Sequence, residues 1–248
     1  MTTLCTAAMV FCSLTGATVY SDAQAALITD RIQLAQTGTK GSGKPSAADR
    51  KIAIMTERIA RNGKDASAYN SRGVAWDDKR QFQKAIADYD KAIALVPDFP
   101  DPYHNKGIAL RKTGRIREAV ESTSMAIRLR PKYFGSYYSR GRSYALLREY
   151  DKAVADYTKS IELNPKFLAA YVSRGNSLDS LKRYDEATAD HDRAIKANPR
   201  HVNAWYNRGV VMGHKGDNDE AITSYRKVLE LQPFHLNAHK ALKRRGAL

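Results

Sequence analysis

The six histidines could do chemistry, because an imidazole side chain can bind a transition metal. His235 and His239 are four residues apart, whereas His201 and His214 are more widely separated. No carboxylate accompanies them at the spacing of metal ligands, and the chain has no HExxH motif. We therefore predict neither a metal site nor a bound cofactor.

The cysteines and one glycine-rich segment are the other candidates for chemistry. Cys5 and Cys12 both fall in the first twelve residues, so a chain processed after this segment would have no thiol. Residues 41–44 (GSGK) resemble a phosphate-binding loop, but Pro45 follows the lysine and no apolar strand precedes the segment. No Ser/His/Asp set or paired-carboxylate motif stands out, and we predict that the protein is not an enzyme.

The charge balance is strongly basic. The 248 residues are 43% apolar and 27% charged, which is the composition of a soluble chain with a core. Forty-one Lys and Arg residues against 26 Asp and Glu give a formal net charge of +15, which favours an acidic partner without identifying it. Polyanion or nucleic-acid binding through the basic surface is the alternative function, and it requires exposed aromatic residues along a basic track.

The N-terminus has the pattern of an export signal. Residues 4–19 carry no charge, and residues 23–25 (AQA) supply the small-x-small site of a signal peptidase, although no Lys or Arg precedes the apolar run. We predict a signal peptide over 1–25, export to the periplasm or cell envelope, and a flexible linker over 26–48. An uncleaved signal would instead tether the protein to a membrane.

From residue 66 onward one pattern recurs every 34 residues. A glycine, a proline and an alanine keep this interval, and an aromatic residue stands four positions before each glycine. The residues are Gly73, Gly107, Gly141, Gly175 and Gly209; Pro97, Pro131, Pro165, Pro199 and Pro233; Ala85, Ala119, Ala153, Ala187 and Ala221; and Tyr69, Tyr103, Tyr137, Tyr171 and Trp205. We expect the small residues where two helices approach closely, and the prolines where a helix ends.

With its strict 34-residue period and these repeated glycine, alanine, proline and aromatic positions, the sequence resembles the tetratricopeptide repeat (TPR) family over five units. The units are 66–99, 100–133, 134–167, 168–201 and 202–235. The resemblance implies an all-α fold, a right-handed solenoid in which each unit is a pair of antiparallel helices, A and B. It also implies a non-catalytic scaffold that binds a peptide or protein partner in a concave groove lined mainly by the A helices.

Apolar residues at helical spacing between these markers predict the core. Besides the aromatic column, they are Trp76, Leu110, Tyr144, Leu178 and Met212 on the A helices, and Ile86, Val120, Val154, Ile222, Ile93, Ile127, Ile161, Ile195 and Leu229 on the B helices. Residues 49–65 repeat the helix-B pattern, so we expect an N-terminal half-repeat there and a C-terminal capping helix over 236–248. His191 replaces an aromatic residue of the other units and is expected to pack in the core.

A cation stands directly before each repeated glycine: Arg72, Lys106, Arg140, Arg174 and Arg208. Three of these cations are followed, sixteen residues later, by an acid: Asp88, Asp156 and Asp190. Because the acids recur with the bases, we favour a repeated ion pair between helices over a basic stripe for polyanions. Exposed pairs of this kind would contribute about 0–1 kcal/mol each.

Position on the A helices and charge together predict the partner-binding site: Asn105, Arg111, Lys112, Tyr138 and Arg142. The cations suit an acidic segment or a free C-terminal carboxylate, which arginine can bind through two hydrogen bonds. Tyr138 directly follows a residue of the core column, so it should point away from the core. Asn105 belongs to a polar column that could hydrogen-bond a peptide backbone or simply be solvated. The alternative for the whole cluster is that it only keeps the protein soluble.

Overall fold

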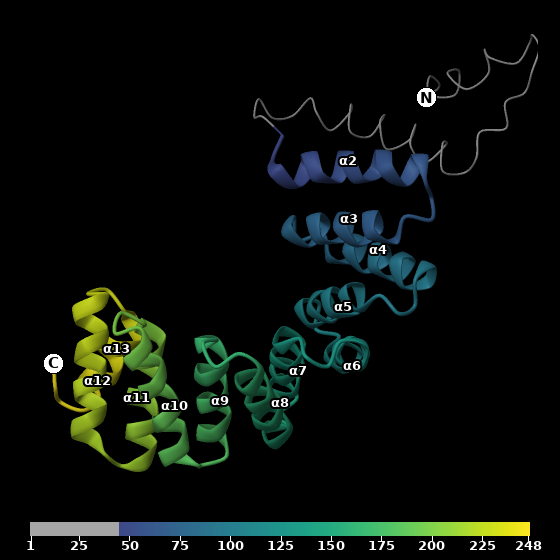
Figure 1. Ribbon diagram of the computed structural model, residues 1–248. Coiled ribbons are helices and arrows are strands. Elements are labelled where there is room, and N and C mark those ends of the chain that lie inside the picture. The colour runs from purple at the N-terminus through teal and green to yellow at the C-terminus, as the bar shows by residue number, and fades with distance from the viewer. Residues whose placement is uncertain (1–44) are drawn as a thin grey trace, which may run out of the picture.

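The computed structural model describes residues 45–248, and in this range it contains twelve α-helices and no strand. A single helix begins the array, five helix pairs follow, and a single helix ends it (Figure 1). The helices are α2 (Ala47–Arg61); α3 (Ala66–Asp78) with α4 (Phe82–Leu95); α5 (Pro100–Lys112) with α6 (Ile116–Leu129); α7 (Phe134–Leu146) with α8 (Tyr150–Leu163); α9 (Leu168–Ser180) with α10 (Tyr184–Ala197); α11 (Val202–Lys215) with α12 (Asn218–Leu231); and α13 (Leu236–Lys243). The predicted all-α repeat fold is confirmed. The signal peptide predicted over 1–25 and nearly all of the linker lie outside the described residues.

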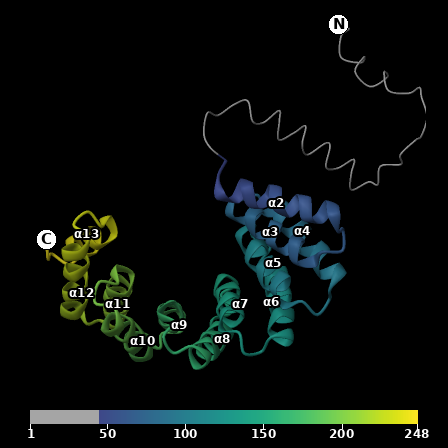
Figure 2. The ribbon, with the colours of Figure 1, turned by 45° about the horizontal axis from the view of Figure 1, so that its top comes forward.

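The helices are stacked in chain order along an open, curved array, with α2 and α13 at opposite ends (Figure 1). Each helix contacts the next one, and neighbouring A helices also contact each other. Figure 2 shows the A helices α3, α5, α7, α9 and α11 on the inner side of the curve, with α13 continuing this row, and the B helices on the outer side. The inner side of the curve therefore carries residues from every repeat.

Local signals explain where the helices begin and end. Ser46 caps α2 by accepting a hydrogen bond from the backbone of Asp49, whose side chain accepts one from the backbone of Ser46 in return. Each repeated proline follows the C-cap of a B helix, as predicted. The turn from helix A to helix B uses one left-handed residue in every unit: Arg80, Gly114, Arg148, Lys182 and Gly216. Only two of the five are glycine, so composition gave little sign of this turn.

The repeated glycine of each helix A allows helix B of the same unit to pack closely against it. A Cβ added to Gly141 would lie 2.8 Å from the ring of Tyr157, and the same overlap occurs between Gly209 and Tyr225. His191 takes this ring position in the fourth unit and is fully buried, as predicted. Of the predicted apolar residues, Leu110, Leu178, Met212, Ile86, Ile127, Ile161 and Tyr171 are buried, and the others are half-buried. The core is thus a row of small clusters, each shared by consecutive helices.

The three predicted Arg–Asp pairs form, but the expectation that they are exposed is wrong. Arg140 donates two hydrogen bonds of 2.8 Å to Asp156, and only 21% and 8% of these side chains are exposed. Arg140 also donates to Ser124 of the preceding B helix at 3.0 Å. The pairs of Arg72 with Asp88 and of Arg174 with Asp190 have the same geometry, because the repeat places the same side chains between the same helices. Each arginine therefore joins three consecutive helices.

No helix in residues 45–248 is both long enough and apolar enough to cross a membrane.

Candidate functional site

The inner face carries a cationic cavity between the second and fourth repeats, with a volume of about 320 Å³. Arg111 of α5 and Arg142 of α7 contribute its two charges. The rest of the lining is Ala145, Leu146, Tyr150, Tyr157, Ser173, Asn176, Ser177 and Ser180. No acidic residue from the described chain lines this cavity, so its two cations face hydroxyl and amide groups. We refer to it below as the central cavity.

Arg111 is held in an unfavourable electrostatic environment. Burial lowers the pKa of its guanidinium, and the positive charge of Arg142 lowers it further. Its Nε is buried and has no hydrogen-bond partner among residues 45–248. Arg142 is exposed, with its guanidinium carbon 5.8 Å from the centre of the Tyr138 ring. A bound anion would neutralise two like charges and supply an acceptor in a partly desolvated place.

Two of the five predicted site residues lie elsewhere and have partners in the preceding repeat. Lys112 donates a 2.6 Å hydrogen bond to Asp77 and lies 5.3 Å from the ring of Phe82. Asn105 donates to Asn70 at 3.1 Å. The structure therefore groups Arg111, Arg142 and Tyr138, but it places Lys112 and Asn105 in contacts between repeats.

Tyr138 is a half-buried residue of an aromatic cluster. Its ring meets Phe167 edge-on at 4.8 Å and lies 5.8 Å from the ring of Tyr157. Its hydroxyl accepts a 3.5 Å hydrogen bond from Ser173. Because the inner face is where neighbouring A helices meet, pointing away from one core does not mean pointing into solvent. Tyr138 thus supports one wall of the central cavity.

Reasoning from the sequence missed all of the cavity lining except its two arginines, including the polar residues Tyr150, Tyr157, Ser173, Asn176, Ser177 and Ser180. Only Ser173 occupies the same repeat position as Asn105, for which the sequence predicts partner binding. The others come from the third B helix and the fourth A helix, and they reach the cavity because consecutive repeats overlap. Aligning the repeats shows which residues occupy equivalent positions. It does not show which residues at different positions contact each other in the folded array.

The histidines have structural roles. His201 and His235 accept hydrogen bonds from the first turns of α11 and α13, and His214 pairs with Asp179 at 2.8 Å. Within the part of the chain that the structure describes, no three His, Cys, Asp or Glu residues are grouped so that they could hold a metal ion.

The stacked helix pairs, with the A helices along the inner side of the curve, define a helical repeat protein. Tetratricopeptide repeat models match residues 136–167 and 170–235, and a TPR repeat model matches residues 78–114. Together these matches cover more than half of the chain. The chain therefore belongs to the tetratricopeptide repeat family, whose arrays are usually non-catalytic scaffolds and typically bind proteins or peptides.

Solved structures with the same arrangement include YrrB, described as a TPR protein with an unusual peptide-binding site. YrrB is 25% identical with a TM-score of 0.67, over 77% of this chain and 99% of YrrB. A MamA structure is 25% identical with a TM-score of 0.61, over 65% of this chain and 94% of MamA. MamA from Desulfovibrio magneticus RS-1 shares the fold at 20% identity, with a TM-score of 0.65 over 69% of this chain and 97% of its own. A comparison with curated protein sequences finds no match.

Proposed function

We propose that this protein is a non-catalytic scaffold that binds an acidic segment of a peptide or protein partner in its inner groove. Three observations support the proposal. The chain is a TPR array, the similar protein YrrB is described as having a peptide-binding site, and the central cavity presents Arg111 and Arg142 with no Asp or Glu of residues 45–248 in its lining. The pattern of residues 1–25 adds the proposal that the array works outside the cytoplasm, in the periplasm or cell envelope.

The unpaired state of Arg111 is the observation that carries the proposal. Two acids of the inner face have partners: Asp77 accepts a hydrogen bond from Lys112, and Asp179 lies 2.8 Å from His214. Within the part of the chain that the structure describes, Arg111 forms no ion pair, and its buried Nε has no acceptor. A guanidinium can give two parallel hydrogen bonds to a carboxylate, which is the geometry that an Asp, a Glu or a chain end offers. The cavity therefore suits a carboxylate better than a neutral group.

Nucleic-acid binding receives less support from this surface. A single strand requires basic residues that alternate with exposed, stackable rings along a continuous track. Asp77 and Asp179 interrupt the row of cations on the inner face, and Tyr138 is packed against other rings. A protein segment is the better occupant of the groove.

Reversing the charge of the central cavity tests the proposal. With Arg111→Glu and Arg142→Glu together, we expect the affinity for an amidated, Glu-rich probe peptide to fall at least tenfold, or about 1.4 kcal/mol. The reason is that carboxylates would replace both unpaired cations, while the melting temperature stays nearly unchanged. Fluorescence anisotropy with a labelled peptide measures the affinity.

The matched control reverses two exposed charges outside the central cavity, Arg128→Glu with Lys132→Glu, so that net charge changes equally. This control should lose little affinity. Equal losses in both variants would mean that net charge, and not the central cavity, attracts the peptide. A pull-down with residues 49–248 at two salt concentrations would then identify natural partners.

A further inference from the structure

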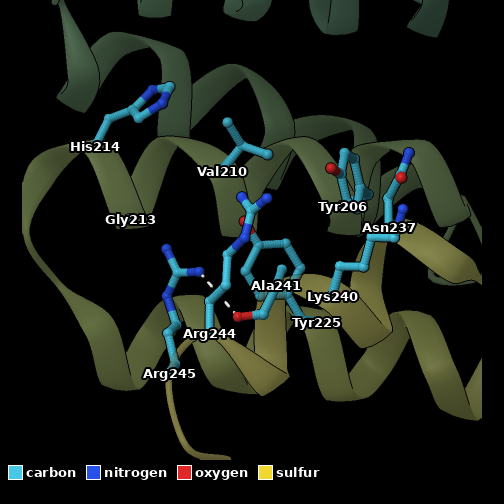
Figure 3. A pocket seen from close by; sticks show the side chains of 10 residues that line it. All are labelled: Tyr206, Val210, Gly213, His214, Tyr225, Asn237, Lys240, Ala241, Arg244 and Arg245. Atoms are coloured by element: carbon cyan, nitrogen blue, oxygen red, sulfur yellow. Dashed lines mark hydrogen bonds between the residues drawn. The ribbon is translucent and has the colours of Figure 1, made fainter.

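A second cationic cavity lies between the last repeat and the capping helix, with a volume of about 280 Å³ (Figure 3). Its charges come from Lys240, Arg244 and Arg245 at the end of the described chain. Tyr206, Tyr225 and Asn237 add polar groups, and no acid from residues 45–248 is part of the lining. The sequence predicted only that this helix would cap the core. The structure shows that the helix also closes a cavity.

Arg245 is positioned by specific contacts. Its guanidinium lies 5.3 Å from the centre of the Tyr225 ring and donates a 3.1 Å hydrogen bond to the backbone carbonyl of Ala241, drawn as a dashed line in Figure 3. A Cβ at Gly213 would overlap the guanidinium, so the glycine leaves room for it on α11. The Nε of Arg245 is buried without a hydrogen-bond partner, as is that of Arg111 in the central cavity.

The two cavities occupy equivalent places in the repeat. Tyr225 lies 68 residues after Tyr157, which is two repeats, and the same interval separates Arg244 from Asn176 and Arg245 from Ser177. The cations differ in origin, because Arg111 and Arg142 come from the second and third A helices whereas Arg244 and Arg245 come from the capping helix. Asp179 of the fourth unit stands two repeats after Arg111 and pairs with His214, which lines the capping-helix cavity.

From this repetition we propose that the capping-helix cavity is a second carboxylate subsite, in register with the central cavity, for the same extended partner. The proposal rests on the proposed function. Packed neighbouring helices are about 8–10 Å apart, so two repeats along the inner face span roughly 20 Å. An extended peptide advances about 3.3 Å per residue, so the two acidic groups of the partner should be about six residues apart. The proposal thus specifies both the charge of the partner's contact groups and the number of residues between them.

Synthetic peptides that are acetylated and amidated test this spacing. One peptide carries a single Glu-Glu pair in a Gly/Ser background, and the others carry two such pairs separated by a short, a matching or a long spacer. We expect the matching peptide to bind at least about tenfold more tightly than the single-pair peptide, because the second contact is intramolecular. Isothermal titration calorimetry measures both affinities.

Substitutions at the end of the capping helix test whether the tighter binding of the two-pair peptide depends on this cavity. Arg244→Gln with Arg245→Gln should remove the gain of the two-pair peptide and leave the affinity for the single-pair peptide within a few-fold. Because Arg245 packs on Tyr225, the variant with Arg244→Gln alone provides a second measurement with less risk to folding. The control, Arg226→Gln with Lys243→Gln, removes two exposed charges near the same end but outside the cavity, and it should keep the gain.

The outcomes separate the two proposals. A protein that binds the single-pair and two-pair peptides equally well overturns the second subsite but leaves the central cavity as a binding site. A gain that survives in the Arg244 and Arg245 variants also overturns it. If the unsubstituted protein binds neither peptide, both this subsite and the proposed acidic partner are wrong.

Discussion

At the scale of single residues, each cation before a repeated glycine pairs with at least one carboxylate, although the helix that supplies the carboxylate varies. Arg72, Arg140 and Arg174 pair with an aspartate sixteen residues later and contact a Ser or Thr sixteen residues earlier. Lys106 and Arg208 reverse this arrangement: Asp90 and Asp192 stand sixteen residues earlier, and serines stand sixteen residues later. Each half-buried cation thus keeps an acidic partner, since an unpaired charge at this place would be costly.

The burial of these pairs predicts measurable coupling. In a double-mutant cycle with Arg140→Ala and Asp156→Ala, we expect a coupling free energy of about 1–3 kcal/mol, because each single change leaves a half-buried charge or acceptor unpaired. Chemical denaturation of the four proteins gives the value. The control cycle uses Arg183 and Glu186, an exposed pair at the start of α10, where a much smaller coupling is expected. Additive effects at Arg140 and Asp156 would contradict the structural role.

At the scale of helix pairs, packing depends on a ring placed over a glycine. Tyr89, Tyr157 and Tyr225 fill this place in three units, Thr123 in the second and His191 in the fourth. Both ring nitrogens of His191 are buried without a hydrogen-bond partner. Burial lowers its pKa from 6.5 to about 4, because the charged imidazolium would lose its hydration. The fourth unit is therefore sensitive to acid.

This pKa predicts how stability changes with pH. The unfolded chain takes up the proton near pH 6.5 and the folded chain only near pH 4, so the His191 contribution is complete above pH 6.5 and is lost as the pH falls toward 4. The loss should be on the order of 2–3 kcal/mol. His104, whose pKa is also lowered by burial to about 4, adds a similar loss.

His191→Tyr should remove the first of these losses, and unfolding curves from pH 7 to pH 4 measure it. The reverse change, Tyr157→His, places an imidazole over Gly141 in the third unit and should make the loss steeper. Identical pH profiles in all three proteins would show that His191 does not titrate with folding.

At the scale of the whole molecule, the array is held together by contacts between neighbours along the chain. The ends differ from the interior. Lys51 and Arg58 stand where the next B helix has Ala85 and Ala92, and Lys243 stands at the place of the repeated glycine. A second copy stacked on either end in the repeat geometry would have to bury Lys51 or Lys243, and Arg58 with its partner Asp65, at a cost in lost hydration. The ends therefore stop the array as well as cover it.

Contacts limited to neighbours predict that repeats can be removed. Deleting residues 202–235 brings the capping helix onto α10 in the same register, so the first four units should keep their helical circular dichroism and melt at a lower temperature. The control deletion, residues 202–216, removes α11 alone and leaves α12 without its partner helix. Loss of all helical signal in the full-unit deletion would contradict a modular array.

The sequence by itself determined the family, the all-α class and the order of the helices. It could do so because every unit must meet the same packing requirement: a glycine under a side chain of helix B, an alanine between helices and a proline after helix B. These requirements recur at 34 residues and are visible without coordinates. The central cations Arg111 and Arg142 could also be named, since their columns lie on helix A.

Only the tertiary structure decided which of these cations have partners. Contacts on the inner face join residues 35 positions apart, as between Asp77 and Lys112 or Asn70 and Asn105, so they cross the columns that the repeat aligns. That offset pairs Lys112 and leaves Arg111 beside Arg142 in the central cavity. The sequence did not predict burial of the Arg140–Asp156 pair, because this burial depends on three helices packing together. The cavity under the capping helix likewise exists only once α13 has folded back against α11 and α12.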